Sequence, residues 1–453
     1  MKLGVVILAA GQGTRMKSNL PKVLHSLAGK PMLAHVVAAA RQLQPHKVIV
    51  VYGHGGDKVQ QALPDTDLLW VEQAEQHGTG HAVQQALPLL DDVDRVLILY
   101  GDVPLINPNA LRELIDRNTA LALLTVMLDD PSGYGRIIRD SDRVIQAIVE
   151  QKDATPDQLA VTEINTGIMS VSQPQLNNWL GRLSNDNAQG EYYLTDIVGF
   201  AVEAAVMVEA SHPLSDMEVI GVNDRMQLAQ LERRFQMANA TRLMQQGVTL
   251  VDPARFDLRG QLSPGKDVYI DVNVIIEGDV ELGDGVCIGA NTVLRNCKVA
   301  QGVSILENCV IEDADIGAAC KIGPFSRIRP GTVLEGEAHI GNFVEIKNST
   351  IAPGSKVNHL SYIGDSLLGS GVNIGAGTIT CNYDGANKHR TVIGDGAFIG
   401  SNSALVAPVQ IAEGATIGAG SVISKDAEAN KLTLARARQV TIENWQRPVK
   451  NKK

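Results

Sequence analysis

The sequence predicts an α/β domain with a mainly parallel sheet, a connecting α-helix and a C-terminal parallel β-helix. Three observations predict this fold class. Apolar runs alternate with longer amphipathic stretches over the first half, a long helical pattern follows, and aliphatic residues then recur every six positions. A length of 453 residues also favours more than one domain. We place the domains at residues 1–226 and 249–453, with the connecting helix at 227–248.

The α/β domain is predicted from three apolar runs at residues 3–9, 48–52 and 96–100, which are typical of buried strands. Each run leads into a glycine-containing loop, and the first and third of these loops are Gly11-Gln12-Gly13 and Gly101-Asp102. Ligands of open α/β sheets bind at the carboxyl ends of the strands. We therefore expect a site in these loops.

A long helix is predicted between residues 223 and 247, where apolar residues fall three and four positions apart among arginines. These apolar residues are Met226, Leu231, Phe235, Ala238 and Met244. Gly247 is a typical helix end. We interpret this helix as the connector between the domains.

The β-helix is predicted from a period that neither an α-helix nor a simple strand has. Each six-residue side of a triangular coil turns one aliphatic residue inward, so stacked coils form one core. Sixteen aliphatic positions keep this phase. They are Ile270, Ile276, Leu282, Ile288, Leu294, Ile322, Ile328, Leu334, Ile340, Ile346, Ile393, Ile399, Leu405, Ile411, Ile417 and Ile423. The polar segment 382–390 interrupts the repeat and predicts an external loop, and such insertions often form binding faces.

Composition excludes several classes of function. Lysine and arginine total 40 against 50 acidic residues, so the net charge of −10 argues against binding to nucleic acid. No apolar run reaches the ~20 residues of a membrane span. The five cysteines lie without CxxC pairing, which favours reduced thiols over a zinc site or disulfides. The N-terminal apolar run leads into a loop with Arg15 and Lys22 rather than a cleavage site, so we expect a cytoplasmic protein.

The first loop carries a phosphate-binding pattern. The string from Leu8 to Met16, followed by Pro21-Lys22, places a glycine turn after a strand, where backbone N–H groups and two cations can meet phosphate oxygens. This chemistry suits a nucleoside triphosphate. The string is not a Walker loop, and Met16 replaces the third glycine of a dinucleotide-binding fingerprint. A tight strand-to-helix turn is the alternative for the GxG alone.

The string resembles the signature of the sugar-1-phosphate nucleotidyltransferases, and the likeness continues through three further motifs. These are Ala74-Glu75-Gln76-His77-Gly78-Thr79, Tyr100-Gly101-Asp102-Val103-Pro104 and Gly133-Tyr134-Gly135-Arg136. With its hexapeptide half, the whole chain is similar to the bifunctional N-acetylglucosamine-1-phosphate uridyltransferases and glucosamine-1-phosphate acetyltransferases. The resemblance implies a Rossmann-like nucleotidyltransferase domain and a left-handed parallel β-helix.

The resemblance also implies roles for N-terminal residues. Arg15 and Lys22 would be catalytic and, with Gly11, would hold the triphosphate of UTP, while Asp102 and Asn223 would hold Mg²⁺. Gln73, Gly78 and Thr79 would read the uracil, and Gly135, Glu150 and Asn165 would hold the acetylated sugar of N-acetylglucosamine-1-phosphate. The remaining residues expected around UTP and UDP-N-acetylglucosamine are Leu8, Ala9, Ala10, Tyr100 and Gly101.

Two of these assignments have an ordinary structural alternative. Asp102 at a strand end could cap a turn, although a carboxylate beside Gly101 is a natural ligand for a hard cation, and we favour the metal. Glu150 and Asn165 could be ordinary polar loop residues, and the sequence without the resemblance leaves both alternatives open.

Several polar residues stand where the repeat usually has small residues, and they lie within a few coils of one another. Arg329 and Lys347 are eighteen residues apart, which is one coil, and His359 follows Lys347 by two sides. An imidazole suits the removal of a proton from an amine that attacks a thioester. A lone histidine in a repeat would more often be solvated, but this one belongs to a cluster.

For the β-helix, the resemblance implies acetyl transfer from acetyl-CoA to glucosamine-1-phosphate. His359 would be the general base, oriented by Glu345. Arg329, Lys347, Tyr362 and Asn373 would hold glucosamine-1-phosphate. The residues expected at acetyl-CoA are Ala376, Asn382, Tyr383, Lys388, Ser401, Ala419 and Arg436. The family is trimeric, which implies a homotrimer with acetyl-transfer sites between β-helices.

Two alternatives stay open at this point. The chain could be a nucleotidyltransferase alone, with a β-helix that serves oligomerisation or regulation. The β-helix could also be a scaffold that binds a partner protein. The cluster of Lys347, His359, Tyr362 and the loop 382–390 argues against both, because a passive solenoid would not need it.

Overall fold

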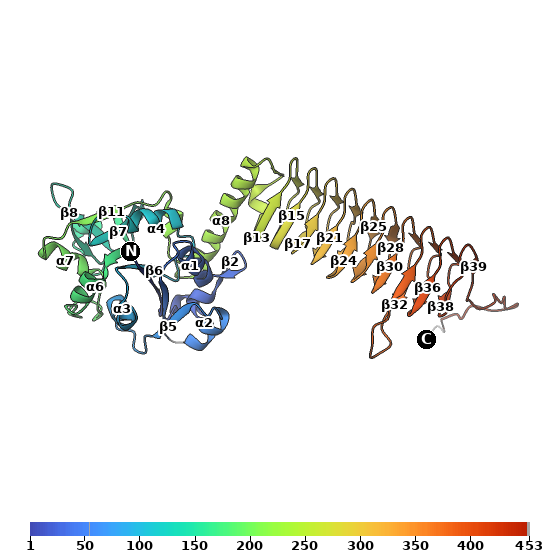
Figure 1. Ribbon diagram of the computed structural model, residues 1–453, viewed down its shortest axis with the longest axis horizontal. Coiled ribbons are helices and arrows are strands. Elements are labelled where there is room, and N and C mark those ends of the chain that lie inside the picture. Colours follow the sequence, from blue (N-terminus) through green and yellow to red (C-terminus); the bar gives the residue numbers. More distant parts are fainter. Residues whose placement is uncertain (54, 451–453) are drawn as a thin grey trace. The chain divides into compact units, whose positions relative to one another are not determined.

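A computed structural model describes residues 1–53 and 55–450 of the chain. His54, which we interpret as structural, and the last three residues of the basic C-terminal tail lie outside the described residues. The chain divides into two compact units, one of Met1–Phe235 and one that begins at Gln236. Figure 1 shows helices and strands mixed in the first unit and stacked strands in the second.

The first unit is built on a mixed sheet that has nine strands in the described chain. Its order is β11-β7-β10-β6-β1-β4-β5, and β8 and β9 extend it beside β10. The strands are β1 (Leu3–Ala9), β4 (Lys47–Tyr52), β5 (Leu68–Glu72), β6 (Arg95–Tyr100), β7 (Leu121–Met127), β8 (Arg136–Arg139), β9 (Ile145–Val149), β10 (Glu163–Ser172) and β11 (Val208–Ser211). A separate hairpin pairs β2 (Ser26–Leu27) with β3 (Lys30–Pro31).

Helices cover both faces of this sheet and enclose two apolar cores. The helices are α1 (Met32–Arg41), α2 (Gly56–Ala62), α3 (Thr79–Ala86), α4 (Pro108–Ile115), α5 (Pro156–Leu159), α6 (Gln173–Leu180) and α7 (Asp196–Glu203). Side chains of α1 and α4 pack in one core, and side chains of α3, α6 and α7 pack in the other. The α/β layering is the one that alternating apolar runs and helical stretches predict.

The three predicted strands are confirmed as β1, β4 and β6, and they pair in parallel with β1 in the middle. The sheet is less parallel than expected, because β10 runs antiparallel between β6 and β7. All but the last residue of β10 are buried, so its sequence is typical of a core strand. Such a sequence does not indicate whether the strand runs parallel or antiparallel to its neighbours.

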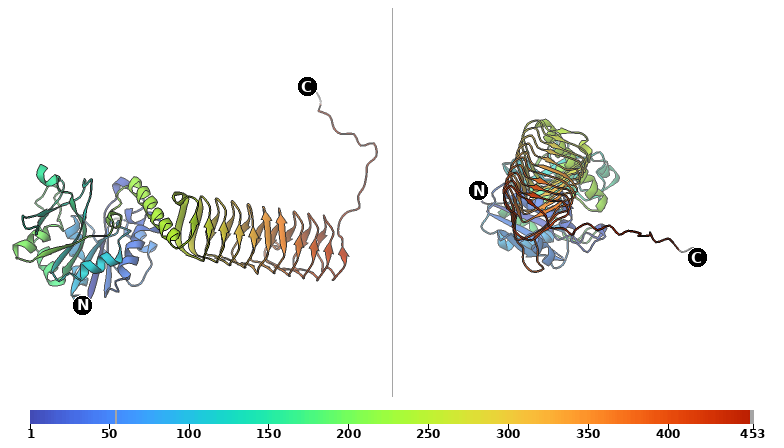
Figure 2. Two further views of the ribbon diagram at one scale, coloured as in Figure 1. Left: turned by 90° about the horizontal axis from the view of Figure 1, so that it is seen from above. Right: turned by 90° about the vertical axis from the view of Figure 1, so that its right-hand side faces the viewer.

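The second unit is a parallel β-helix, which confirms the fold class expected from the six-residue period. Figure 2 shows its coils stacked one upon the next. One face is an eleven-stranded parallel sheet within the described residues. Its strands are β12 (Thr249–Leu250), β14 (Tyr269–Ile270), β16 (Cys287–Ile288), β19 (Ser304–Ile305), β22 (Lys321–Ile322), β25 (His339–Asn342), β28 (Lys356–His359), β31 (Asn373–Ile374), β34 (Phe398–Ile399), β37 (Thr416–Ile417) and β39 (Leu432–Thr433).

A second parallel sheet supplies the other two faces of the coils. On the face that follows the first sheet along the chain lie β13 (Phe256–Pro264), β15 (Val274–Leu282), β17 (Val293–Arg295), β20 (Val310–Glu312), β23 (Arg327–Ile328), β26 (Glu345–Lys347), β29 (Tyr362–Gly364), β32 (Ile379–Cys381), β35 (Ala404–Val406) and β38 (Val422–Ile423). On the last face lie β18 (Lys298–Val299), β21 (Ala314–Ile316), β24 (Thr332–Leu334), β27 (Thr350–Ile351), β30 (Ser366–Leu368), β33 (Thr391–Ile393) and β36 (Val409–Ile411). The long strands β13 and β15 run across both faces.

The core of the β-helix consists of the residues that keep the six-residue phase. All sixteen predicted positions are buried and belong to one continuous apolar cluster. Cys297, Cys309 and Cys320 are buried within it as free thiols, whereas Cys287 is exposed and Cys381 half-buried. Burial raises the pKa of Cys297 to about 12 and that of Cys309 to about 11. The expected reduced thiols are confirmed, although burial holds for three of the five.

The predicted long helix is α8 (Arg225–Gln245), and Gly247 follows it with a φ of 97°. Only some of the apolar residues that define its predicted packing face are buried. Leu231 is buried in the first unit, but Met226 is 70% exposed. In the second unit, Ala240 and Leu243 join the core of the β-helix and the side chain of Gln236 bonds both backbone polar groups of Leu258.

Candidate active sites

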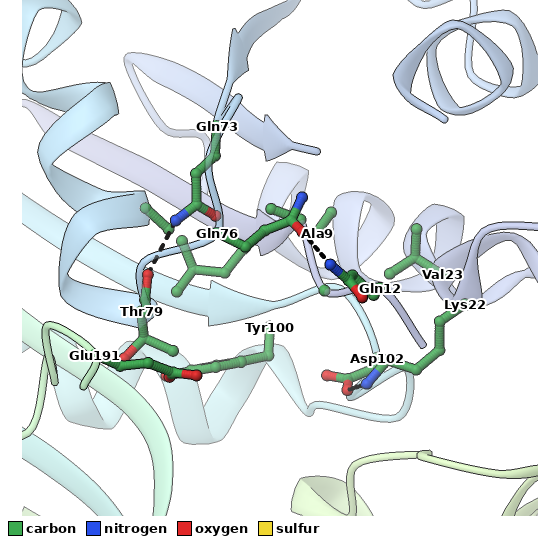
Figure 3. Close-up of a pocket in the computed structure, with 15 residues that line it drawn as sticks. Ala9, Gln12, Lys22, Val23, Gln73, Gln76, Thr79, Tyr100, Asp102 and Glu191 are labelled. Carbon is green, nitrogen blue, oxygen red and sulfur yellow. Dashed lines mark hydrogen bonds and ion pairs between the residues drawn. The ribbon is translucent and has the colours of Figure 1, made fainter. Parts of the chain in front are cut away.

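A cavity of about 520 Å³ opens at the carboxyl ends of β1 and β6 in the first unit, where the sequence predicts a site. Figure 3 shows side chains from these strand ends and from the segment 73–79 facing the same space. The lining residues are Leu8, Ala9, Ala10, Gly11, Gln12, Lys22, Val23, Gln73, Gln76, Gly78, Thr79, Ala82, Tyr100, Asp102 and Glu191. Of the residues expected to contact the triphosphate and the base, all except Arg15 therefore line this one cavity.

The glycine turn after β1 is shaped by a close approach to Lys22. Gly13 has a φ of 61°, and a Cβ atom there would lie 2.6 Å from Cβ of Lys22. Glycine is the residue that tolerates both constraints. The turn therefore brings Lys22 against the strand end, and Gly101 closes over the same region because its amide donates to Leu8 O at 2.9 Å.

Four predicted residues form one polar network at the edge of the cavity. The Lys22 ammonium makes an ion pair with Asp102 and donates to Asn223 Oδ1 at 3.4 Å. Arg15 donates to the same Asn223 oxygen at 2.9 Å. Figure 3 shows Lys22 and Asp102 directed at each other. Residues far apart in the chain thus place two cations and two hard oxygen donors within reach of one another.

The opposite end of the cavity is set by Gln73 and the start of α3. Gln73 is 3% exposed, and its Nε2 donates to Gly78 O at 3.0 Å and approaches Nδ1 of His81 at 3.1 Å. Gly78 has a φ of 107°, and a Cβ there would lie 2.7 Å from Tyr192 O. The three predicted base-reading residues are adjacent in space, as their spacing suggests.

The three predicted sugar-binding residues are also brought together. Asn165 N donates to Gly135 O at 2.9 Å, and a Cβ on Gly135 would lie 3.3 Å from Oε1 of Glu150. Thr195 donates to Glu150 at 3.2 Å. Burial raises the pKa of Glu150, and the negative charges of Asp153, Asp196 and Glu191 raise it further.

Tyr100 connects this group with the cavity. Burial, together with the charges of Glu150 and Asp102, raises the pKa of its phenol, which therefore stays neutral. A Cβ on Gly167 would lie 2.4 Å from the Tyr100 ring, so glycine leaves room for it. The three residues expected at the sugar lie outside the cavity lining, whereas Tyr100 is part of it.

Sequence reasoning missed several residues of the cavity wall. Gln12 donates to Gln76 Oε1 at 2.8 Å across the mouth of the cavity, as Figure 3 shows. Both glutamines stand inside motifs whose resemblance was noted, so a signal existed. Glu191 comes from a loop with no recognisable pattern, and only the tertiary structure places it here.

The second candidate site lies on the β-helix, where a ladder of alternating charges ends. Facing positions on β13, β15, β17 and β20 are Arg259, Glu277, Arg295 and Glu312, and consecutive members form ion pairs of 3.2, 2.6 and 2.9 Å. Arg329 continues the series and pairs with Glu345 at 2.7 Å.

The alternation of positive and negative charge ends at Lys347, which lies close to other cations. Contact with the Lys388 amine, followed by the positive charges of Lys388 and Arg329, lowers the pKa of Lys347. Glu345 already pairs with Arg329, so the excess positive charge lies on Lys347 and Lys388, and this excess favours the binding of an anion. Predicted Arg329, Lys347 and Lys388 are thus brought together, and Glu345 pairs with Arg329.

His359 stands at the corner between two faces of the coil. Its Nδ1 lies 3.0 Å from Asn342 Oδ1, an amide oxygen that can only accept. Nδ1 therefore carries the proton, and Nε2 is left as the basic nitrogen. The sequence assigns the orientation of His359 to Glu345, whereas Asn342, which sequence reasoning missed, makes this contact. The signal was weak because Asn342 is one of many small polar corner residues.

Three of the seven predicted acetyl-CoA residues lie in one row with His359. Asn342, His359, Ala376, Ser401 and Ala419 take the same corner position on successive coils, and each backbone carbonyl except that of Ala419 bonds the amide that follows the next residue of the row. These bonds are Leu360 N to Asn342 O, Gly377 N to His359 O, Asn402 N to Ala376 O and Gly420 N to Ser401 O, with distances of 2.7 to 3.2 Å. Arg436 then donates to Ala419 O at 3.0 Å.

Three hydrogen-bonded side chains lie beside this row, those of Tyr362, Asn382 and Asp365. Asn382 donates to Tyr362 Oη at 3.4 Å and also to the buried Asp365 carboxylate. A Cβ on Gly364 would lie 2.4 Å from the Tyr362 hydroxyl, so Gly364 leaves the space that the ring occupies. Asn373 lies on β31 of the first sheet, where it is the register partner of Lys356 on β28.

The predicted external loop is confirmed and is held by its own contacts. Asp384 Oδ1 accepts from the amides of Ala386 at 2.8 Å and Asn387 at 2.6 Å, and Oδ2 contacts His389 at 2.7 Å. These bonds lower the pKa of Asp384. Tyr383 and Lys388 face each other in a short antiparallel bridge. The loop therefore presents Lys388 next to Lys347.

Comparisons with known proteins match both units. A MobA-like NTP transferase domain matches residues 5–167, the GMPPB C-terminal domain matches 259–342, and six bacterial transferase hexapeptide repeats match 390–425. Every helix among the described residues is too short or too polar to cross a membrane.

Curated relatives match from end to end. Bifunctional protein GlmU of Acinetobacter baylyi is 57% identical over 455 residues, that of Ralstonia pickettii 57% over 453 and that of Nitrosomonas eutropha 58% over 456. All three alignments cover 100% of this chain and 100% of the relative. With a nucleotidyltransferase cavity in one unit and a hexapeptide β-helix as the other, this chain belongs to the bifunctional GlmU family.

Proposed function

We propose that this chain makes UDP-N-acetylglucosamine in two steps. The β-helix transfers the acetyl group of acetyl-CoA to glucosamine-1-phosphate, and the α/β unit then transfers the uridylyl group of UTP to N-acetylglucosamine-1-phosphate and releases pyrophosphate. One observation carries the proposal: each unit has its own group of cations, Arg15 with Lys22 at the edge of the cavity in the first and Arg329, Lys347 and Lys388 on the β-helix in the second.

In uridylyl transfer, a phosphate oxygen of the sugar attacks the α-phosphorus of UTP in line and pyrophosphate leaves. Such a reaction needs positioning and charge neutralisation more than covalent help from the protein. Arg15 and Lys22 neutralise the triphosphate, and the glycine turn lets backbone N–H groups approach its oxygens. Gln73, Gly78 and Thr79 bind the uracil at the other end of the cavity.

Asp102 and Asn223 fit a Mg²⁺ site. Both oxygens already share one cation, the Lys22 ammonium, and oxygen donors are what Mg²⁺ prefers. Among the described residues no cluster of three His, Cys, Asp or Glu side chains could enclose a metal, which suits an ion that takes few protein ligands and completes its shell with water and phosphate. When bound, Mg²⁺ neutralises charge on the phosphates. Lys22, which pairs with Asp102, would be the cation beside the triphosphate.

In acetyl transfer, the amine of glucosamine-1-phosphate attacks the thioester carbonyl, a proton leaves the nitrogen and coenzyme A leaves as the thiol. His359 Nε2 takes the proton, since Asn342 keeps Nδ1 protonated. Arg329 and Lys347 hold the sugar phosphate. Lys388, which the resemblance places at acetyl-CoA, joins them because it lies against Lys347. Tyr362 and Asn373 line the sugar, and Asn382, also expected at acetyl-CoA, lies beside Tyr362. Ala376, Ser401, Ala419 and Arg436 form the track along which acetyl-CoA lies, with Tyr383 beside it.

The chain works as a homotrimer with acetyl-transfer sites between β-helices. Support comes from three consecutive coils that carry Phe325, Phe343 and Leu360 at left-handed corner positions, with φ of 56°, 56° and 50°. Neighbouring coils have Asn or Gly there, which this conformation favours. The three apolar side chains are 50%, 55% and 64% exposed, and the two phenyl rings stack at 5.4 Å. A second copy that covers this edge would also border the row that contains His359.

The predicted compartment is the cytoplasm. The five cysteines are all free, which a reducing compartment favours.

The test is thiol release from acetyl-CoA in the presence of glucosamine-1-phosphate, compared between the parent chain and His359→Ala. We expect release in the parent and a loss of about 10²-fold or more in the variant. Release that persists in His359→Ala would contradict the role of the base. A folded parent that releases no thiol but forms UDP-N-acetylglucosamine from UTP would leave a single-activity nucleotidyltransferase with a non-catalytic β-helix.

A further inference from the structure

The amide of Gln73 is held in one orientation by two acceptors. Gly78 O can only accept a hydrogen bond, so the nitrogen of the amide must be the atom 3.0 Å from it. The second N–H of this nitrogen points to Nδ1 of His81 at 3.1 Å. Both donors of the amide are therefore used within the protein.

The remaining polar atom of Gln73 is Oε1, and it is left for a ligand. Gln73 is 3% exposed yet lines the cavity, and Figure 3 shows its oxygen turned away from the nitrogen that makes the hydrogen bond drawn as a dashed line. A buried oxygen at the base end of the cavity accepts from a base that donates there. Uracil has an N–H at the centre of its pairing edge, whereas cytosine has a bare nitrogen acceptor at that place.

The contact requires one tautomer of His81. Nδ1 accepts only if the ring is neutral with its proton on Nε2. The Nε2 atom lies 3.1 Å from the side-chain amide nitrogen of Gln85, which also donates to His81 O at 3.3 Å. Nε2 keeps its proton if the Gln85 amide is turned over, so that its oxygen accepts from the ring. The titratable groups around the ring are His77 at 5.2 Å between ring centroids, Tyr192 at 6.4 Å and Glu75. Burial, followed by the charge of His77, lowers the pKa of His81 and keeps the ring neutral.

We propose that His81 is a positioning residue that locks the Gln73 amide with Oε1 toward the base and so sets the preference for UTP over CTP. The proposal rests on the proposed function, in which Gln73 reads the uracil. His81 touches no substrate in this arrangement. If Nδ1 of His81 is removed, one N–H of the Gln73 amide has no acceptor in the protein. The amide then gains a hydrogen bond by turning this N–H toward a base that accepts.

The experiment compares kcat/KM for UTP and CTP in the full-length parent and in two variants. His81→Phe keeps an aromatic ring and removes the acceptor. His81→Asn replaces Nδ1 by an amide oxygen at nearly the same place. We expect the UTP-to-CTP ratio of kcat/KM to fall about tenfold in His81→Phe, the value of one lost hydrogen bond, and to recover in His81→Asn.

His77→Leu is the matched control, because the His77 side chain lies beside His81 but bonds Glu75 rather than Gln73. Burial, the larger cause of the lowered His81 pKa, is unchanged in this variant, so the ring stays neutral. Its ratio is expected to match that of the parent. A His81→Phe variant whose two kcat/KM values fall in equal proportion, so that the ratio is unchanged, would overturn the proposal and leave His81 a packing residue. If His81→Phe is unfolded by circular dichroism, His81→Leu takes its place with the same expectation. A parent that forms no product from UTP would contradict the proposed function itself.

Discussion

At the scale of single residues, the two sites separate cleanly because each depends on side chains of its own unit. Asp102 accepts the Lys22 ammonium in the first unit, and His359 contacts Asn342 in the second. Arg15, Lys22 and Asp102 were expected at one site because they stand in motifs that resemble the nucleotidyltransferase signature, and the structure brings them together. Asn342 and His81 were not, because their importance lies in one hydrogen bond to a neighbour that no spacing reveals.

Asp102→Ala is expected to abolish uridylyl transfer and to leave acetyl transfer intact, whereas His359→Ala is expected to do the reverse. Removing the carboxylate takes away the proposed metal ligand and the partner of Lys22, with a loss of about 10³-fold or more. The check is to assay pyrophosphate release and thiol release separately on both variants. A folded variant that loses both activities would contradict the assignment of one site to each unit.

Glu150→Gln tests the cost of burying a carboxylate at the proposed sugar site. Because burial raises the Glu150 pKa, its ionisation opposes folding once the pH exceeds the ordinary value for a carboxyl group. We expect the variant to unfold about 2–4 °C higher at pH 7 and to bind N-acetylglucosamine-1-phosphate more weakly. The gain in Tm should vanish near pH 4, where the parent carboxyl is protonated in both folded and unfolded chains. Calorimetry across pH, with KM for the sugar phosphate, measures both effects, and equal Tm values at pH 7 would contradict the destabilising role of this charge.

At the scale of elements, the sequence predicts the parts with strong local periods best. The strands β1, β4 and β6 and the inward-facing residues of the coils follow from apolar patterns alone. The antiparallel insertion of β10 could not be predicted, because pairing direction depends on partners far away in the chain. The packed face of α8 was also missed, since Ala240, Leu243 and Gln236 find partners only in the folded β-helix.

The external loop gives an element-scale prediction. Asp384→Ala removes the acceptor of three bonds that hold the loop, so Lys388 loses its fixed place beside Lys347. We expect KM for glucosamine-1-phosphate to rise about tenfold while the uridylyl transfer of the same protein is unchanged. Because hydrogen bonds lower the Asp384 pKa, the parent loop should keep its contacts at any pH above the ordinary carboxyl range. An unchanged KM in acetyl transfer would show that the loop does not position Lys388.

At the scale of the whole molecule, the proposed trimer rests on the edge formed by Phe325, Phe343 and Leu360. Asparagine at these corners satisfies the left-handed backbone, as it does at Asn291 and Asn402, so replacing both phenylalanines removes apolar surface without straining the coil. The double variant should therefore fold and assemble poorly.

The measurement for Phe325→Asn with Phe343→Asn is light scattering during size-exclusion chromatography. We expect the parent at about three times 48.4 kDa, and the double variant shifted toward 48.4 kDa with acetyl transfer reduced and uridylyl transfer retained. Asn308→Ser, at the same corner on an earlier coil, is the control and should leave the mass unchanged. A double variant with the parent's mass would place the subunit contact elsewhere.

The stacking of the β-helix also makes the protein a molecular spacer of adjustable length. Each coil bonds only the coils before and after it, and the residues around His359 are contributed by a few consecutive coils. Coils such as 274–291 lie well before them. Duplicating that segment would lengthen the rod by one rung of about 4.8 Å and leave the acetyl-transfer chemistry intact. The number of rungs ahead of the site can therefore change without altering the site, whereas the number within it cannot.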